Sequence, residues 1–232
     1  MKTLGIVGGI APESTVDYYR RIVALYRERQ SDGSYPSVII NSIDLKKMLD
    51  LLGGGKLPEA TQYLLAELNR LAKAGADFCL FASNTPHLVF EDLERGSPVP
   101  LLSIVEATCD AAVALGLNKI ALLGTRFTMQ GGFYPKVFSR RRIDIVVPSP
   151  DEQDYVHDRY MNELIHGIFR AETRERMAAI MERLRRQEGV QAVILGGTEL
   201  PLLFRDGAQP DIPLLDTTKI HVERAVAQLL EK

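Results

Sequence analysis

The stretch Phe81-Ala82-Ser83-Asn84-Thr85-Pro86-His87 decides the fold, because a buried strand is predicted to end in it and a helix to begin. Residues 77–82 form a short apolar run of the kind found at the centre of a parallel sheet. Pro86 predicts a helix start: it costs no hydrogen bond at the first helical position, and it holds Thr85 extended, where the hydroxyl can cap the helix. Ser83, Asn84 and Thr85 are therefore expected at the carboxyl end of a strand. In an α/β sheet ligands bind there, and the helix N-terminus favours an anion such as a carboxylate.

The same plan occurs a second time along the chain. A glycine, an apolar strand, small residues, a threonine and a helix start follow one another in residues 75–86 and again in 189–201. Ser83 and Gly197 take corresponding places 114 positions apart, and the glycines that end two other apolar runs, Gly8 and Gly124, are 116 positions apart. Two pairs with nearly one offset indicate two similar halves, with a chance match of short apolar runs as the alternative.

Strands alternate with helices along the whole sequence, which predicts a parallel α/β architecture. The expected strands are 2–7, 37–42, 77–82, 101–102, 119–123, 143–147, 192–195 and 213–215, and the expected helices are 12–29, a short one after Asp44, 57–74, 86–95, 104–115, 153–168, 170–187 and 219–230. We expect two pseudo-symmetric lobes, each a parallel sheet flanked by helices, with a ligand cleft between them. Residues 1–103 plus 209–232 are assigned to lobe 1, and residues 104–208 to lobe 2.

Composition argues against several classes of protein. The chain has 232 residues, of which 46% are hydrophobic and 25% charged, as in an ordinary globular protein. A net charge of −2, with lysines and arginines spread along the chain, gives no reason to expect a nucleic-acid partner. No apolar run approaches the roughly 18 residues of a membrane span, and the apolar opening is too short for a signal peptide. Cys79 and Cys109 lie in apolar stretches, which favours buried free thiols and a cytoplasmic location over a disulfide.

Several polar residues near the predicted strand ends have two interpretations. His87 can titrate near neutral pH, but its place in a first helical turn favours a structural role. Glu199 is favoured at a helix N-terminus by the dipole, where a capping role is preferred to that of a general base. Asp216 is expected to cap the last helix. Arg126 could hold a carboxylate through two hydrogen bonds, or lie on the surface as most arginines do.

Five motifs, in order and at matching spacing, resemble those of the aspartate/glutamate racemase family. They are Gly8-Gly9-Ile10-Ala11-Pro12-Glu13-Ser14-Thr15, Ser83-Asn84-Thr85-Pro86-His87, Gly124-Thr125-Arg126-Phe127-Thr128, Gly196-Gly197-Thr198-Glu199 and Asp216-Thr217-Thr218. The resemblance covers essentially the whole chain. It implies a ligand site in the cleft between the lobes, no cofactor such as pyridoxal phosphate, no metal, a homodimer, and a small amino acid or dicarboxylate as ligand. The residues that it assigns to substrate binding are Gly9, Asn84, Thr85, Thr125, Thr128, Thr198 and Glu199.

The resemblance also implies a reaction, a 1,1-proton transfer at the α-carbon of an acidic amino acid. In that family two cysteines, one in a Cys-Asn-Thr and one in a Gly-Cys-Thr motif, face opposite sides of this carbon. Ser83 and Gly197 stand at the two catalytic positions here. A thiol with a pKa of about 8.5 can be tuned into a base near neutral pH, whereas a serine hydroxyl needs an adjacent base, and glycine has no side chain. Neither Cys79, inside a strand, nor Cys109, on a distant helix, can substitute, so two-thiol racemisation is not available.

We therefore expect a racemase-family protein, an isomerase by descent, that binds a small, acidic amino acid or carboxylate. Four interpretations stay open within that frame. The chain could be a racemase or epimerase acting through non-thiol groups, or a lyase, decarboxylase or isomerase with altered acid and base groups. It could bind its ligand without turnover. Finally, Ser83 or Gly197 could be an engineered change that traps a ligand.

Overall fold

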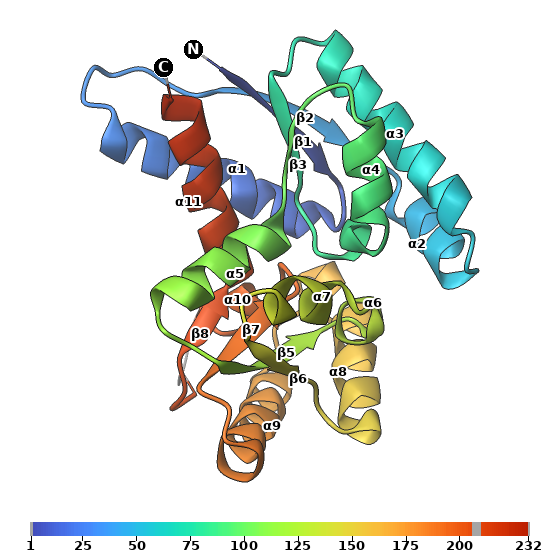
Figure 1. Ribbon diagram of the computed structural model, residues 1–232, viewed down its shortest axis with the longest axis vertical. Helices are drawn as coiled ribbons and strands as arrows, with labels where there is room; N and C mark the ends of the chain where they lie inside the picture. Colours follow the sequence, from blue (N-terminus) through green and yellow to red (C-terminus); the bar gives the residue numbers. More distant parts are fainter. Residues whose placement is uncertain (1, 206–209, 232) are drawn as a thin grey trace. The chain divides into compact units, whose positions relative to one another are not determined.

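The chain divides into two units, each built on one parallel sheet (Figure 1). The computed structural model describes residues 2–205 and 210–231. One unit runs to Ile104 and resumes at His221, and the other spans Val105–Ile220. Within the described residues the strand order is β2-β1-β3-β4 in the first sheet and β6-β5-β7-β8 in the second. The two halves thus have one topology, as the repeated strand-to-helix plan predicts.

The first unit carries four strands and most of the N-terminal helices. Its strands are β1 (Thr3–Gly8), β2 (Ser37–Ser42), β3 (Phe78–Phe81) and β4 (Leu101–Leu102), and its helices include α1 (Pro12–Arg29), α2 (Leu45–Gly53), α3 (Leu57–Lys73), the 3-10 helix η1 (Thr85–Val89) and α4 (Phe90–Gly96). In the parallel register Val7 of β1 lies opposite Phe81 of β3. The carboxyl ends of these two strands therefore meet at one edge of the sheet.

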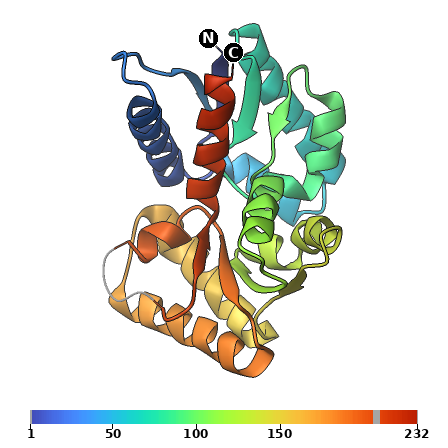
Figure 2. The ribbon, with the colours of Figure 1, turned by 60° about the vertical axis from the view of Figure 1, so that its left-hand side comes forward.

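The core of the first unit joins the two ends of the chain. Helix α11 (Thr217–Leu230) covers the same face of the first sheet as α1 (Figures 1 and 2). Val222 and Val226 of α11 are buried in one cluster with Tyr18 and Ile22 of α1 and Leu4 of β1. Apolar residues at three- and four-residue spacing along both helices supply this face.

The second unit is a continuous segment with the same alternation. Its strands are β5 (Lys119–Gly124), β6 (Asp144–Val146), β7 (Ala192–Gly196) and β8 (Leu214–Asp216), and its helices are α5 (Ile104–Ala114), α6 (Arg126–Gln130), α7 (Phe133–Ser139), α8 (Pro150–Asn162), the 3-10 helix η2 (Leu164–His166), α9 (Ala171–Glu188) and α10 (Leu200–Leu203). Helices α8 and α9 contribute Val156, Tyr160, Met177 and Ile180 to a buried cluster with Leu195 of β7.

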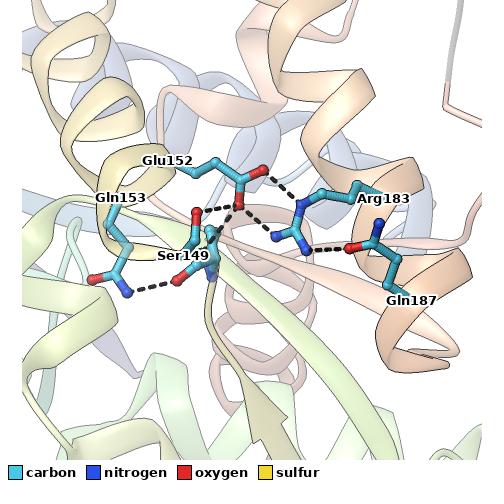
Figure 3. A network of polar contacts seen from close by, with 6 residues as sticks. Ser149, Glu152, Gln153, Arg183 and Gln187 are labelled. Atoms are coloured by element: carbon cyan, nitrogen blue, oxygen red, sulfur yellow. Dashed lines mark hydrogen bonds and ion pairs between the residues drawn. The ribbon is translucent and has the colours of Figure 1, made fainter.

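A network of polar contacts fixes the start of α8 to α9 (Figure 3). Ser149 and Glu152 form a capping box, in which the Ser149 backbone N–H donates to Glu152 Oε2 over 3.0 Å. Arg183 of α9 donates to both oxygens of the same carboxylate, over 2.7 Å from Nε and 2.5 Å from Nη2. Burial raises the pKa of Glu152, but the bonds from Arg183 and Ser149 outweigh it and leave that pKa below its usual value. The helix is thus anchored at its N-terminus by a charged pair.

The other end of α8 is fixed by a buried carboxylate. Glu163, just beyond the helix, accepts hydrogen bonds from Arg159 Nη1 over 2.9 Å and from Thr173 Oγ1 of α9 over 2.5 Å. The helix expected over 153–168 therefore ends early, at Asn162, and continues as η2. Both ends of α8 are held against α9, which fixes the position of the side chains that α8 presents to the sheet.

Two sequence predictions need correction. Thr85 was expected to cap a helix that starts at Pro86, but it lies inside η1, whose N-terminal cap is Asn84 in a helical conformation. The chain tightens there because the His87 N–H bonds to the Asn84 carbonyl over 3.0 Å. The predicted division placed residues from 209 onward in the first lobe, whereas β8 pairs with β7 and only residues from His221 join the first unit.

Candidate functional site

The carboxyl edge of the first sheet collects Gly9 and the first turn of α1. The Gly9 N–H donates to Thr15 Oγ1 over 2.8 Å, and Ser14 Oγ lies 3.4 Å from the Ala82 carbonyl, directly after β3. Gly9 has φ +81°, and a Cβ added to it would lie 2.6 Å from the Ile43 carbonyl oxygen. Only glycine therefore fits here, because the Ile43 backbone lies against the position that a side chain would take.

Ser83, Asn84 and Thr85 follow β3 and are all buried. His87 stacks on Phe90 with 4.4 Å between ring centroids, and its Nδ1 lies 3.2 Å from the Asn84 carbonyl oxygen. Burial, and to a smaller extent His221, lowers the pKa of His87 to about 3. His87 is therefore neutral at physiological pH, and the contacts favour its structural interpretation.

The carboxyl edge of the second sheet is formed by the ends of β5 and β7. Gly124 and Gly196 are register partners, and Thr128 packs over both: a Cβ on Gly124 would lie 3.0 Å from Thr128 Cβ, and one on Gly196 would lie 3.0 Å from Thr128 Cγ2. Thr125 Oγ1 and Thr128 Oγ1 are 3.3 Å apart. The glycines at the ends of β5 and β7 thus leave room for Thr128, and the Thr125 and Thr128 hydroxyls lie together at this sheet edge.

Tyr160 of α8 fills the space in front of Gly197. A Cβ added to Gly197 would lie 2.4 Å from Tyr160 Cε2, 2.6 Å from its hydroxyl oxygen and 2.7 Å from Cζ. These separations are far below van der Waals contact, so a side chain at 197 and the tyrosine ring exclude each other. The absence of a side chain at 197 therefore leaves room for the phenol at the end of β7.

Glu199 holds this phenol. The Tyr160 hydroxyl donates a short hydrogen bond to Glu199 Oε2, Thr198 Oγ1 donates to the same oxygen over 3.1 Å, and the Glu199 N–H lies 3.4 Å from the phenol oxygen. Burial first, then the Glu199 charge and its hydrogen bond, raise the pKa of Tyr160 well above its usual value. The capping role predicted for the Glu199 side chain is wrong, because its carboxylate turns to Tyr160 and Thr198 instead.

The other polar candidates have structural partners. Arg126 Nη2 donates to Asp154 over 2.8 Å, and both side chains are largely exposed, which matches the surface interpretation. Asp216 Oδ1 accepts from the Lys219 N–H over 2.9 Å, so its predicted capping of the last helix is confirmed.

Cys79 and Cys109 are free and buried, as predicted. Burial raises the pKa of Cys79 to about 12 and, together with the nearby Glu106 and Asp110 carboxylates, that of Cys109 to about 11. Both thiols therefore keep their protons at neutral pH, and neither is a nucleophile or a base there.

Each unit therefore brings its own share of the predicted site residues to one sheet edge. Gly9, Ser83, Asn84 and Thr85 lie at the ends of β1 and β3, and Thr125, Thr128, Gly197, Thr198 and Glu199 lie at the ends of β5 and β7. Tyr160 is the member that sequence reasoning missed. The one signal for it is indirect, a glycine at a strand end that otherwise repeats the Ser83 motif.

In the part of the chain that the structure describes, no group of three His, Cys, Asp or Glu side chains is arranged to hold a metal ion. Across the same residues, no helix combines the length and the apolar character needed to cross a membrane.

Comparison with known proteins identifies the family. The sequence profile of the Asp/Glu/hydantoin racemases matches residues 7–225. The chain belongs to this racemase family. It is 24% identical over 233 residues to the broad-specificity amino-acid racemase RacX of Bacillus subtilis, covering 98% of each protein.

Solved structures of the racemase family share the whole fold. A candidate Asp/Glu racemase from Yersinia pestis is 33% identical with a TM-score of 0.88, and an aspartate racemase homologue from Pyrococcus horikoshii is 35% identical with a TM-score of 0.83. Each comparison covers 100% of both chains. The fold class inferred from the sequence is therefore confirmed, with two four-stranded parallel sheets flanked by helices over the described residues.

Proposed function

We propose that this racemase-family chain binds a small amino acid, with acidic amino acids and related dicarboxylates preferred, at the carboxyl ends of its strands. Family membership and the similarity to an amino-acid racemase support the ligand class. One observation carries the proposal: buried polar side chains gather directly after buried apolar strands in both units. Asn84, Thr85, Thr125, Thr128 and Thr198 are each at most 7% exposed. Hydroxyl and amide groups are the donors that suit a carboxylate, and buried ones hold it away from competing water.

The proposed chemistry does not use two thiols. Racemisation removes the proton from the α-carbon and returns one to the opposite face, so each face needs an acid/base group. Ser83 offers only a hydroxyl, Gly197 has no side chain, and Cys79 and Cys109 hold their protons inside the core. Ligand binding without turnover is accordingly the second candidate function, favoured by the absence of a side chain at 197. The homodimer and the cytoplasmic location inferred from the sequence stay predictions.

A thermal-shift screen against L- and D-amino acids and small dicarboxylates tests the binding. A ligand at 100 times its dissociation constant stabilises the folded state by roughly 2.7 kcal/mol, which raises the melting temperature by about 5–10 °C. Thr198→Val should reduce this shift. Thr61→Val is the matched control, since Thr61 is also a buried threonine but bonds within α3, to the Leu57 carbonyl. If no amino acid or dicarboxylate shifts the melting temperature, the proposed binding function is wrong.

A further inference from the structure

The end of β7 holds a buried tyrosine and carboxylate that the binding proposal leaves without a role. Tyr160 is 4% exposed and Glu199 is 1% exposed, and the phenol donates to the carboxylate. Removing two polar side chains from water in this way costs free energy even when they are bonded to each other. Tyr160 belongs to a buried apolar cluster that includes Val156, Leu164 and Leu195, so its ring packs among apolar side chains while its hydroxyl is bonded to the carboxylate.

The pair lies beside the proposed carboxylate-binding hydroxyls. Thr198 Oγ1 donates to the same Glu199 oxygen as the phenol, and Thr128 packs against Gly196 at the end of the strand. The Tyr160 hydroxyl oxygen would be 2.6 Å from a Cβ at 197, so it reaches the backbone of the strand end itself. A ligand held by these threonines would therefore have the phenol oxygen next to it.

The other titratable groups at the predicted site residues do not offer this chemistry. His87 is neutral and stacked on Phe90, and its pKa of about 3 makes it a weak base. Cys79 lies inside β3 with a pKa near 12. At the end of β7 the described groups able to exchange a proton are Tyr160 and Glu199, joined by one hydrogen bond.

We propose that Tyr160 and Glu199 form a proton relay that exchanges the α-proton of the bound amino acid from one face. The proposal rests on the binding function proposed above. In the forward step the Cα–H bond breaks and its proton goes to the Tyr160 oxygen, while the phenol O–H bond breaks and its proton goes to Glu199 Oε2. The electron pair of the C–H bond stays on the substrate as the enolate of its carboxylate, and the reverse transfers return a proton. Nothing is oxidised or reduced, and no co-reactant is consumed.

The relay assigns each residue a distinct part. The carboxylate is the base, because the phenol keeps its proton at neutral pH and cannot act as one alone. The phenol oxygen is the atom that exchanges the proton with the substrate, and the absence of a side chain at 197 leaves space for the phenol there. A single relay works from one side of the α-carbon, so we expect hydrogen exchange on one enantiomer without inversion to the other.

The test is solvent-deuterium exchange at the α-carbon, followed by proton NMR, for whichever amino acid stabilises the protein. The parent should exchange the α-proton of one enantiomer. Tyr160→Phe keeps the ring, and Glu199→Gln keeps the hydrogen-bond acceptor, and each should lower the exchange rate by about 100-fold or more while the ligand still shifts the melting temperature. Tyr155→Phe is the matched control on α8, a half-buried tyrosine whose loss should leave the rate unchanged.

The outcomes separate the two proposals. Ligand stabilisation without any exchange by the parent would overturn the relay and leave the binding function intact, whereas no stabilisation would refute the binding function first. Exchange retained within twofold by Tyr160→Phe or by Glu199→Gln would also overturn the relay. The two variants alter opposite ends of the hydrogen bond. If only one of them folds, its exchange rate alone is enough to test the relay.

Discussion

The contact between Gly197 and Tyr160 makes a sharp prediction about stability. Gly197→Ala places a methyl carbon 2.4 Å from Tyr160 Cε2 and 2.6 Å from its hydroxyl oxygen, where about 3.5 Å or more is needed. The ring must retreat by roughly 1 Å, although α8 is fixed at both ends and the hydroxyl is bonded to Glu199. Overpacking of this kind costs about 1–3 kcal/mol, and weakening a hydrogen bond to a charged group adds about 1–2 kcal/mol.

We therefore expect Gly197→Ala to destabilise the protein by about 2–5 kcal/mol, which lowers the melting temperature by roughly 5–20 °C. Thermal unfolding followed by circular dichroism measures this. Tyr160→Leu removes the atoms that clash. The loss of unfolding free energy in the double variant should therefore be about 1–3 kcal/mol smaller than the sum of the losses in the two single variants. Gly33 is the control, because an added Cβ there meets nothing within 4 Å. The losses of unfolding free energy caused by Gly33→Ala and by Tyr160→Leu should add in the double variant.

A melting temperature for Gly197→Ala within 1–2 °C of the parent, or strict additivity with Tyr160→Leu, would refute the reasoning about this contact. The same geometry bears on any attempt to introduce a thiol at this strand end. Gly197→Cys meets the Tyr160 ring with its first side-chain carbon. A cysteine at 197 therefore needs a smaller residue at 160 before its activity can be interpreted.

Three further predictions follow from the pKa values. The pKa of His87 is about 3 in the folded protein but near 6.5 in the unfolded chain. The free energy of unfolding therefore has its full value above pH 6.5 and falls by up to about 1.4 kcal/mol per pH unit below it. Melting temperatures between pH 7 and 4 should change less steeply with pH for His87→Asn than for the parent, and an unchanged slope would contradict this. The pKa of Glu152 is lowered, so its bonds to Arg183 stabilise α8 fully above the usual carboxyl pKa of about 4.3, and this stabilisation is lost progressively as the pH falls below it. Glu152→Gln should cost about 2 kcal/mol at pH 7 and progressively less in acid, and a cost that does not change with pH would argue against the charged pair. Cys79 and Cys109 should resist a thiol reagent in the native protein and both react in urea, so labelling of either one without denaturant would show that it is accessible.

The fold could be predicted from the sequence because the signals for its strands and helices are local. The apolar runs of β1, β5 and β7 each end in a glycine that marks the turn after the strand, and helix α1 begins at Pro12 as predicted. Helix α11 is capped by Asp216 for the same local reason. The repeated motif predicted two similar halves, and the two sheets have the same strand order over the described residues.

What the sequence did not reveal depends on tertiary contacts. Tyr160 reaches Glu199 across 39 positions, and its helical neighbours give no hint that its ring faces a strand end. Glu199 follows a threonine before an apolar turn, which is typical of a cap, but the phenol takes its carboxylate instead. The pairing of the short strand β8 with β7 is likewise a tertiary contact, and it places residues 214–216 in the second unit, whereas the sequence-based division assigned them to the first.

The return of the chain to its first unit governs the order in which the protein can fold as it is synthesised. Domains generally form from the N-terminus onward during translation. Here the sheet that is made first buries Leu4 and Ile6 against Val222 and Val226, which are among the last residues to be added. The inserted segment Val105–Ile220 is complete before them. A chain that lacks the residues from 221 onward therefore leaves this apolar face of the first unit uncovered.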